Sequence, residues 1–429
     1  MSVDNSDPSL LWAALSRERF ASPVLEGSQR ASVAVIGGGI SGLSTALHLA
    51  RQGADVVVLE AGEIGAGASG RNNGQVIPTL TRHDPAAILK AWGEERGERF
   101  LRMLERSANL LFDTVTHYEI DCDAARTGWL QPAHSPGRAR AAERRAAQWQ
   151  SRGAPARAVS ADEMARRLGT DAYFGGWVHD GGGHINPLAF TRGLARAAAQ
   201  EGATVFAQSP VTALARMQTG WQLTTPRGEV QADKVVLATA AYTNGLWPGL
   251  ARTIVPVVSY QVATQPLGSA AATVLPNNEA CSDTRMDLRY FRKDREGRLV
   301  SGGALAIPAY AYPRVAHLVA NRLASLFPQL PEIHPQNVWS GRIAMSPERL
   351  PRLHRTADGL VAWIACNGRG LALSMAMGAV VADAVRGARD EDLAVTPSPM
   401  QEIPFAPILA KTARLAMPYF RFQDRKEIT

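Results

Sequence analysis

The sequence predicts an α/β protein with two domains, and three observations lead to this class. Residues 33–60 have the pattern of a strand, a glycine turn, a helix and a second strand. Strand-like and helix-like segments alternate beyond that unit, which is typical of a parallel sheet covered by helices. The chain has 429 residues, more than one ordinary hydrophobic core organises, so a second domain is expected.

The glycine turn of the first unit has the spacing of a dinucleotide-binding fingerprint. Gly37, Gly39 and Gly42 form G-x-G-x-x-G at the start of a helix whose first residues include Ile40 and Ser41. Gly37 permits the sharp turn, Gly39 lets a pyrophosphate approach the backbone, and Gly42 lets the helix pack closely on the sheet. Unpaired N–H groups and the positive dipole end of this helix attract phosphates. The first domain is therefore predicted to be Rossmann-like.

An acidic residue follows at the expected distance. The second strand, over 54–60, ends at Glu60, whose carboxylate is placed to accept hydrogen bonds from ribose hydroxyls. A carboxylate there would repel a ribose phosphate, which argues against NADP.

The other elements are predicted from hydrophobic periodicity and turn residues. Residues 1–30 read as an irregular lead-in and 61–84 as an extended glycine-rich segment. Helices are expected over 86–118, 138–152, 188–201, 314–327 and after Gly370 to Arg386, with Asn186 and Pro187 starting the third. Strands are expected over 203–207, 211–216, 221–225, 234–239, 255–265, 288–293, 298–302 and 360–364, with a hairpin turn at 294–297.

This alternation predicts how the domains are built. Residues 29–84, 155–245 and 335–386 are expected to form the discontinuous nucleotide-binding domain. Residues 85–154 and 246–334 are expected to form an α+β substrate domain with a mainly antiparallel sheet, and 387–429 a C-terminal tail. Such a layout places a substrate between the two domains.

Composition argues against several other classes of protein. Lysine and arginine number 46 against 39 acidic residues, giving a net charge of +7, but the arginines are scattered along helices. This pattern is typical of a solvated surface, so we expect no nucleic acid partner. No apolar run reaches the roughly 18 residues of a membrane span, and the first residues do not have the pattern of a signal peptide.

The three cysteines, Cys122, Cys281 and Cys366, are isolated in the sequence. They form no C-x-x-C pair and no spacing typical of metal ligands, so no metal site is expected. Unpaired cysteines favour a reducing compartment, and we expect a cytoplasmic protein.

A second motif, GASGRNNGQ at 67–75, follows the first unit directly. With it, the chain resembles the D-amino-acid-oxidase-like family of FAD-dependent amine oxidoreductases, and within that family the gamma-glutamylputrescine oxidase branch. The resemblance extends over nearly the whole chain and rests on further stretches at 182–195, 235–244, 290–303, 339–351, 366–378 and 403–424.

The resemblance implies a bound FAD and assigns residues to it. Besides the glycine turn and Glu60, residues along the ribityl chain and flavin ring would be Ser69, Arg71, Asn72, Gly74 and Gln75. The backbone of Val211 would meet the adenine. The pyrimidine edge of the flavin would lie against Gly368, Arg369, Gly370, Leu371 and Ala372. A helix that starts after Gly370 would stabilise the negative charge that reduced flavin carries on that edge.

Two departures from the family pattern refine these implications. Ala344 stands where relatives that tether the flavin have a cysteine, so we expect non-covalent FAD. Ala372 replaces a lysine, and Ile343-Ala344 an Arg-Pro pair, that hold a substrate carboxylate in relatives. A simple free amino acid is therefore a poorer fit, although Arg342 or Arg289 remains able to bind an anionic group.

The function implied is oxidation of an amine by hydride transfer to flavin, giving an imine or aldehyde and hydrogen peroxide. The alternative is an amino-acid or imino-acid dehydrogenase that passes electrons to a quinone or a partner protein. An accessory flavoprotein of a larger complex is a further reading. Polyamine conjugates, N-methyl amino acids and cyclic imino acids all remain open as substrates. The cavity candidates are Tyr290, Arg342 and His184.

Overall fold

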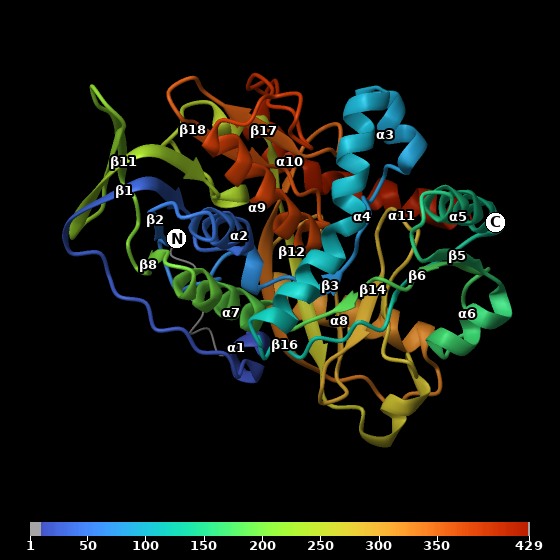
Figure 1. Cartoon of the computed structure of the whole chain (residues 1–429). Coiled ribbons are helices and arrows are strands. Elements are labelled where there is room, and N and C mark those ends of the chain that lie inside the picture. Colours follow the sequence, from blue (N-terminus) through green and yellow to red (C-terminus); the bar gives the residue numbers. More distant parts are fainter. Residues whose placement is uncertain (1–9, 428–429) are drawn as a thin grey trace.

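Two eight-stranded sheets organise residues 10–427, the part of the chain that the computed structural model describes (Figure 1). In the first sheet the strand order is β17-β18-β11-β1-β2-β8, and β10 and β9 extend it from β11. Its strands are β1 (Gly27–Ile36), β2 (Val56–Leu59), β8 (Thr204–Phe206), β9 (Ala213–Arg216), β10 (Trp221–Thr224), β11 (Gly228–Leu237), β17 (Arg352–Arg355) and β18 (Leu360–Ile364).

The centre of the first sheet is parallel and apolar. Val35 of β1 is paired in register with Val236 of β11 on one side and with Val58 of β2 on the other, and all three are buried. Strands buried on both faces read as continuous apolar runs, which is why this part of the sheet was predictable. The strands predicted over 211–216 and 221–225 correspond to β9 and β10, which pair antiparallel.

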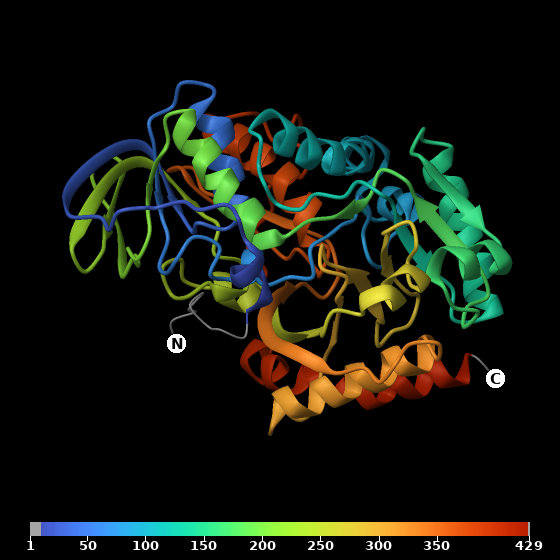
Figure 2. The same cartoon turned by 90° about the horizontal axis from the view of Figure 1, so that it is seen from below.

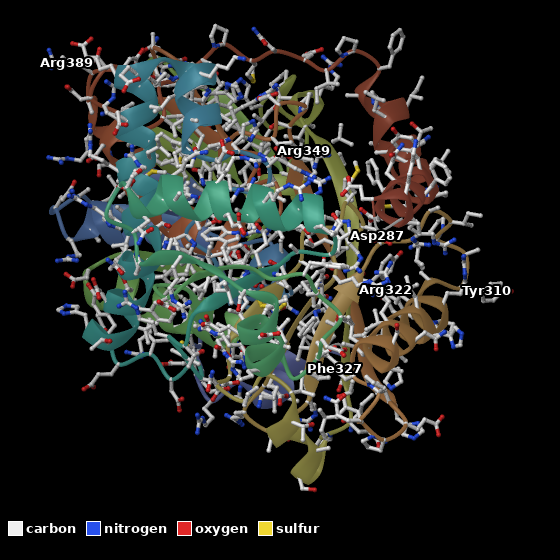
Figure 3. The ribbon with its side chains drawn as sticks, turned by 90° about the vertical axis from the view of Figure 1, so that its right-hand side faces the viewer. Asp287, Tyr310, Arg322, Phe327, Arg349 and Arg389 are labelled. Carbon is white, nitrogen blue, oxygen red and sulfur yellow. The ribbon has the colours of Figure 1, made fainter. Side chains whose placement is uncertain are left out.

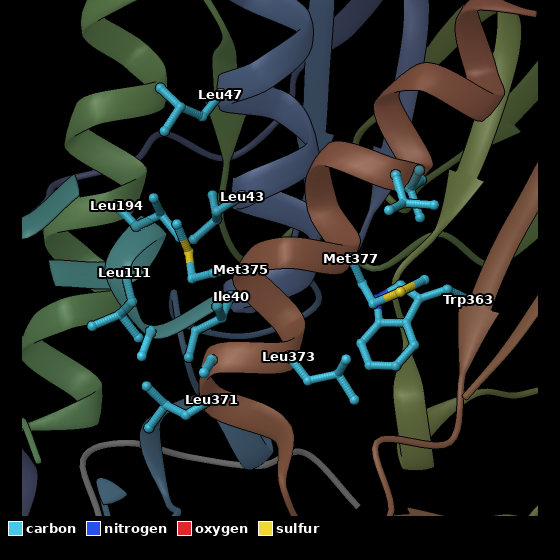
Figure 4. Close-up of a cluster of buried hydrophobic side chains, with 14 of the residues drawn as sticks. Ile40, Leu43, Leu47, Leu111, Leu194, Trp363, Leu371, Leu373, Met375 and Met377 are labelled. Atoms are coloured by element: carbon cyan, nitrogen blue, oxygen red, sulfur yellow. The ribbon is translucent and has the colours of Figure 1, made fainter. Parts of the chain in front are cut away.

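Helices α2 (Ile40–Ala50), α7 (Pro187–Gln200) and α9 (Gly370–Arg386) pack together, and α4 (Glu94–His117) packs on α9. Leu43 and Leu47 of α2, Leu194 of α7 and Met375 of α9 meet in this core (Figure 4). Small residues bring α2 and α9 close, since a Cβ added to Gly378 would lie 2.2 Å from Ser44 Oγ.

The second sheet has the order β16-β12-β15-β14-β13-β4-β6-β5 and is antiparallel except for the β13–β4 pair. Helix α8 (Ala311–Leu326) packs on it, and the helices of the C-terminal segment lie on the same side (Figure 2). Its strands are β4 (Trp129–Pro132), β5 (Ala156–Val159), β6 (Gly176–His179), β12 (Val255–Thr264), β13 (Ala280–Ser282), β14 (Tyr290–Lys293), β15 (Leu299–Gly303) and β16 (Pro335–Met345).

A short two-stranded sheet lies between the two large ones. It pairs β3 (Gln75–Val76) with β7 (Gly183–His184), so that Gln75 faces His184 in register. The remaining helices are α1 (Leu11–Leu15), α3 (Pro85–Trp92), α5 (Pro136–Gln150), α6 (Ala161–Leu168), α10 (Ala406–Thr412) and α11 (Met417–Lys426). Short 3-10 helices lie at η1 (Ala68–Gly70), η2 (Ala240–Tyr242), η3 (Leu250–Thr253), η4 (Gly268–Thr273) and η5 (Ala413–Ala416).

Several predictions need correction. Residues 1–9 of the predicted lead-in lie outside the described residues; beyond them the lead-in contains α1, and β1 begins at Gly27, well before the apolar run. The helix predicted over 86–118 is broken at Gly93, which has a φ of 77° and separates α3 from α4. The amphipathic periodicity continues across the break, so the pattern alone did not reveal it.

Sheet membership also differs from the prediction in two stretches. Strands β5 and β6, within 155–245, and β16, at the start of 335–386, pair in the second sheet, although these stretches were assigned to the nucleotide-binding domain. A short buried strand does not indicate which sheet it joins, because its partners lie far away in the sequence. The other domain limits stay a prediction.

No helix among residues 10–427 is long and apolar enough to cross a membrane.

Candidate functional site

A cavity of about 300 Å³ lies where the two large sheets meet. The strand ends and helix starts of the first sheet form one side, and strands β12 and β14 of the second sheet form the other. In open α/β sheets, ligands bind in the crevice outside the carboxyl ends of the strands, and this cavity has that position relative to β1 and β18. Most of the predicted site residues line it: Gly39, Ile40, Ser41, Ser69, Arg71, Asn72, Gly74, Gln75, Tyr290, Arg342, Gly368, Arg369, Gly370 and Leu371.

The glycine turn has the geometry that its sequence predicts. Gly37 has a φ of 118°, and a Cβ there would lie 2.7 Å from the carbonyl oxygen of Ala238. At Gly42 a Cβ would lie 2.0 Å from the carbonyl oxygen of Gly37, so only glycine lets the helix start this close to the strand. The N-cap residue of α2, Gly39, has no side chain to cap the helix, and the Ile40 N–H donates to Ser69 Oγ at 3.0 Å. The start of the helix lines the cavity at Gly39, Ile40 and Ser41, where a phosphate could approach the backbone.

Glu60 holds the turn from the adjacent strand. Its carboxylate accepts the N–H of Gly38 at 2.7 Å and the N–H of Gly62 at 2.9 Å. Burial raises the pKa of Glu60, and these backbone hydrogen bonds partly offset that rise. Glu60 does not line the cavity, so its predicted contact with a ribose stays a prediction.

The segment at 71–75 is fixed by long-range hydrogen bonds. Trp12 Nε1 donates to the carbonyl of Asn72 at 2.8 Å, and Arg292 Nε donates to the carbonyl of Asn73 at 2.9 Å. Arg292 is almost fully buried, and its guanidinium also lies over the Trp12 ring, 4.5 Å from the centroid. The lead-in and the second sheet thus clamp this segment from two directions.

Side chains of the second sheet and of the segment at 71–75 form a polar chain along one wall of the cavity. Gln261 Nε2 donates to the hydroxyl of Tyr290 at 2.7 Å, and Asn73 Nδ2 donates to Gln261 Oε1 at 3.2 Å. Gln75 Nε2 donates to Asn73 Oδ1 at 3.0 Å, which leaves Gln75 Oε1 buried without a partner. Burial raises the pKa of Tyr290, so its phenol is neutral. The chain presents neutral donors and acceptors to the cavity.

The opposite wall is the start of α9. Arg369 is the N-cap residue and provides no side-chain cap, so the first N–H groups of the helix are left for a ligand. Its guanidinium lies 4.5 Å from the centroid of the Trp129 ring, and Nη1 donates to Thr79 Oγ1 at 3.4 Å. The side chain is 5% exposed, and Nη2 is buried without a hydrogen-bond partner. Burial, and then the charges of Arg145 and Arg82, lower the pKa of Arg369 to about 9.

His184 is not a cavity residue, which corrects the prediction that grouped it with Tyr290 and Arg342. It lies behind Gln75 on β7, and its Nε2 is 3.0 Å from the carbonyl oxygen of Asn278. Burial, and then the charge of Arg292, lower the pKa of His184 to about 3, so the ring is neutral. The sequence placed it near the site; its ring instead lies against the carbonyl of Asn278 and does not reach the cavity.

Four predicted cofactor residues besides Glu60 also lie outside the cavity lining. Gly37 and Gly42 shape the backbone behind it, and Ala372 is buried in α9. Val211 is 7% exposed and packs in the apolar cluster on the far face of the first sheet. Its contact with an adenine stays a prediction.

Other lining residues were missed by sequence reasoning. Asn73 lies in the motif at 67–75, but the resemblance assigns its neighbours Asn72 and Gly74 to the cofactor and not Asn73. Ser259, Gln261 and Leu288 reach the cavity from strand β12 and from the approach to β14, and no local pattern distinguishes them. Trp363 belongs to the apolar run at 360–364, which predicts a buried strand and not a cavity residue. Its Nε1 donates to Ser41 Oγ.

The residues present fit a flavin dinucleotide. The glycine cradle at the start of α2 has no room for side chains, and the cavity continues from it past Ser69 and Asn72 to the start of α9. Two buried polar atoms without partners, Gln75 Oε1 and Arg369 Nη2, belong to residues that line this path. Such atoms are costly unless a ligand satisfies them.

Comparisons with known proteins agree with this geometry. The family model described as "DAO: FAD dependent oxidoreductase" matches residues 32–384. Gamma-glutamylputrescine oxidoreductase of Escherichia coli (strain K12) is 31% identical over 379 residues, which is 88% of either chain.

Among solved structures, glycine oxidase from Geobacillus kaustophilus superposes with a TM-score of 0.70 at 22% identity, covering 84% of this chain and 96% of that one. L-proline dehydrogenase from P. horikoshii gives a TM-score of 0.71 at 21% identity, covering 84% and 94%. These structures share the fold. The family match and the identity to the Escherichia coli enzyme show that this chain belongs to the DAO family of FAD-dependent oxidoreductases.

Proposed function

We propose that this protein oxidises an amine of the gamma-glutamylputrescine type, primary or secondary, with non-covalent FAD, and that oxygen is the final electron acceptor. The observation that carries the proposal is the single cavity that joins the glycine cradle and the start of α9 to the side chains of β12 and β14. It offers a place for a small amine beside the flavin. When bound, FAD supplies a two-electron acceptor for a hydride from the carbon next to the amine nitrogen.

The charge pattern of the cavity favours a neutral amine, the form that can give up a hydride. No aspartate or glutamate is among its described lining residues, whereas Arg71, Arg342 and Arg369 are. Apolar lining side chains such as Leu288 and Trp363 further disfavour an ammonium ion. The bound amine would therefore have a lowered pKa without a dedicated base. As hydride leaves, the nitrogen lone pair forms the C=N bond, and water then hydrolyses the imine to an aldehyde.

The two walls have different roles in this proposal. The first turn of α9 and Arg369 supply positive charge at the flavin edge where negative charge develops on reduction. The chain of Tyr290, Gln261 and Asn73 positions the substrate by hydrogen bonds from the facing sheet. Tyr290 is the candidate for direct substrate contact.

Cys366 lines the cavity, but its chemistry supports non-covalent FAD. Burial raises the pKa of the Cys366 thiol, so it is protonated at neutral pH. The thiolate is the nucleophile, and a protonated thiol is a poor one. All three cysteines are free, which also supports the proposed cytoplasmic location.

A peroxide-coupled screen of amines tests the proposal. We expect gamma-glutamylputrescine or a close analogue to reduce the flavin under anaerobic conditions, and oxygen uptake to match peroxide formed in air. Acid precipitation should release all the yellow colour into the supernatant. If the flavin is reduced by the amine but oxygen consumption is negligible beside turnover with a quinone analogue, the dehydrogenase alternative replaces the oxidase.

A further inference from the structure

The surface formed by α8 and the C-terminal helices carries most of the exposed large apolar side chains among residues 10–427. Three of them, Ile307, Tyr310 and Tyr312, lie at the start of α8 and in the loop before it. Six lie on α10, η5 and α11 and on the residue before α10: Phe405, Ile408, Leu409, Leu415, Tyr419 and Phe422. We call these nine side chains the apolar face. Only three other large apolar side chains of the described chain are exposed.

Contacts with the second sheet bring the two parts of the apolar face together. Helices α8 and α10 both pack on β12, and the Tyr312 ring lies edge-on to Tyr260 of that strand, with the ring centroids 6.1 Å apart. Arg322 of α8 and Arg421 of α11 both bind the Asp287 carboxylate. The helices therefore lie side by side as one layer (Figure 2). Monomeric proteins rarely expose apolar side chains grouped in this way, and such groups mark interaction surfaces.

The C-terminal part of this surface is also strongly basic. Residues 403–426 contain a single acidic residue, Asp424, which is buried and accepts backbone N–H groups. The flanking carboxylates of Glu402 and Glu427 are ion-paired with arginines outside the segment. The segment has five basic residues: Lys411, Arg414, Arg421, Arg425 and Lys426. Lys411, Arg414 and Arg425 are exposed and form no ion pair with described residues, so positive charge accompanies the apolar side chains.

This charge favours a lipid surface over a second copy of the chain. In a symmetric dimer the same patch of both subunits would meet, so the cations of the two copies would face each other. An anionic membrane instead attracts Lys411 and Arg414, while the phenylalanine and leucine side chains enter the boundary between headgroups and acyl chains. The most exposed aromatic side chains suit this boundary: Tyr310 is 85% exposed and projects beyond α8 (Figure 3), and Phe405 is 75% exposed.

We propose that the apolar face docks this protein on a membrane surface that contains anionic lipids, with α10 and α11 lying in the plane of that surface. Binding of this kind is peripheral, since side chains enter the lipid while the helices stay at its boundary. It agrees with the proposed cytoplasmic location, because the cytoplasmic leaflet carries anionic lipids. Docking depends on neither the amine nor the electron acceptor of the proposed function.

Sedimentation of the holoenzyme with lipid vesicles tests the docking. One set of vesicles consists of phosphatidylcholine alone, and the other also contains the anionic phosphatidylglycerol. We expect the flavin absorbance to sediment with the anionic vesicles and to remain in the supernatant with the neutral ones. Added salt should weaken the binding, because it screens the exposed lysine and arginine charges. Absence of sedimentation with the anionic vesicles, or equal sedimentation with both sets, would overturn the proposal.

Substitutions divide the effect between apolar side chains and charges. Leu415→Ser should weaken binding to the anionic vesicles at least about tenfold, the scale of one leucine removed from an apolar environment. Lys411→Gln and Arg414→Gln should each weaken it about fivefold, the contribution of one cation near an anionic surface. Met217→Ser and Arg106→Gln, at exposed side chains between β9 and β10 and on α4, are the matched controls and should bind as the parent does. All five should purify with FAD, and unchanged binding in the three C-terminal variants would refute docking through this segment.

The behaviour of the protein without lipid separates docking from self-association. We expect the parent and Leu415→Ser to elute alike in gel filtration, since the apolar face is not used between copies. A parent dimer that Leu415→Ser converts to a monomer would assign the face to a second copy and overturn membrane docking. Vesicle binding by a protein that oxidises no amine would refute the proposed function and leave the docking standing.

Discussion

The two large sheets approach the cavity in different ways. The first sheet contributes mainly backbone: the turn at Gly37 and Gly39 and the uncapped start of α9. The second sheet contributes side chains, notably Tyr290 and Gln261, which are joined by a hydrogen bond to Asn73 of the segment at 71–75. We expect these backbone groups to hold the phosphates and the flavin edge of FAD, the cofactor of the family. Side chains can be exchanged without disturbing the fold, so substrate choice is expected to reside in the second sheet.

The largest effect, loss of bound FAD, should follow from adding a side chain to the glycine turn of the first sheet. A Cβ at Gly39 would lie 2.7 Å from Ser69 Oγ, and the branched side chain of valine would fill the space where the pyrophosphate approaches. We expect Gly39→Val to purify without FAD, measured as the ratio of flavin to protein absorbance after desalting. Gly245→Val is the control, because nothing lies within 4 Å of a Cβ at that position. A Gly39→Val protein as yellow as the parent would refute backbone recognition at this turn.

His184, on the short sheet between the two large ones, should make the stability of the protein depend on pH. His184 has an ordinary pKa of 6.5 and a folded value of about 3, so below pH 6.5 the unfolded chain binds a proton that the folded protein does not. The contribution of the neutral His184 to the free energy of unfolding is fully present above pH 6.5. It is lost as the pH falls towards 3, by up to about 1.4 kcal/mol per pH unit.

Denaturant unfolding between about pH 6 and 4 measures this contribution. The slope of unfolding free energy against pH should be shallower in His184→Gln than in the parent by about 1.4 kcal/mol per unit. The same change at the exposed His317 controls for the loss of an imidazole side chain. Parallel curves for parent and His184→Gln would show that the short sheet does not hold a neutral histidine.

The smallest effect should come from one hydroxyl of the second sheet. Tyr290→Phe leaves Gln261 Nε2 without its acceptor at 2.7 Å, a loss of about 0.5–1.5 kcal/mol. We expect flavin reduction by the best amine to slow two- to tenfold, with FAD content unchanged. Tyr310→Phe, at a side chain that projects into solvent (Figure 3), controls for loss of a hydroxyl. Loss of FAD from Tyr290→Phe would show that the second sheet also holds the cofactor.

The sequence revealed much of the first sheet because its main features are set by neighbouring residues. It revealed less of the second sheet, whose features depend on residues far apart in the sequence. Gly37, Gly39 and Gly42 are close in sequence because a turn is local, and the end of β11, Val235 to Leu237, is an apolar run because it is buried on both faces. Helix α7 was also predictable from Asn186, which accepts the N–H groups of Leu188 and Ala189.

The second sheet is assembled from strands distant in sequence. Gln261 is 188 residues from Asn73, and nothing in the local pattern around either indicates that their amides meet. Strands β5, β6 and β16 were not predicted, and the stretches that contain them were assigned to the nucleotide-binding domain, because pairing in the second sheet depends on partners far along the chain. His184 was misplaced because its ring lies against the carbonyl of Asn278, a contact across 94 residues that no local pattern indicates.

The clamp on the flavin segment has a consequence for biosynthesis. The Asn72 carbonyl accepts a hydrogen bond from Trp12, which is synthesised early. The Asn73 carbonyl accepts one from Arg292, which is synthesised 219 residues later. The α9 wall is completed later still, after residue 370. Because closing such long loops is entropically costly until both ends are present, a nascent chain cannot retain FAD before most of it has been translated. Cofactor supply therefore matters at the end of synthesis, and truncated products should be colourless and prone to aggregation.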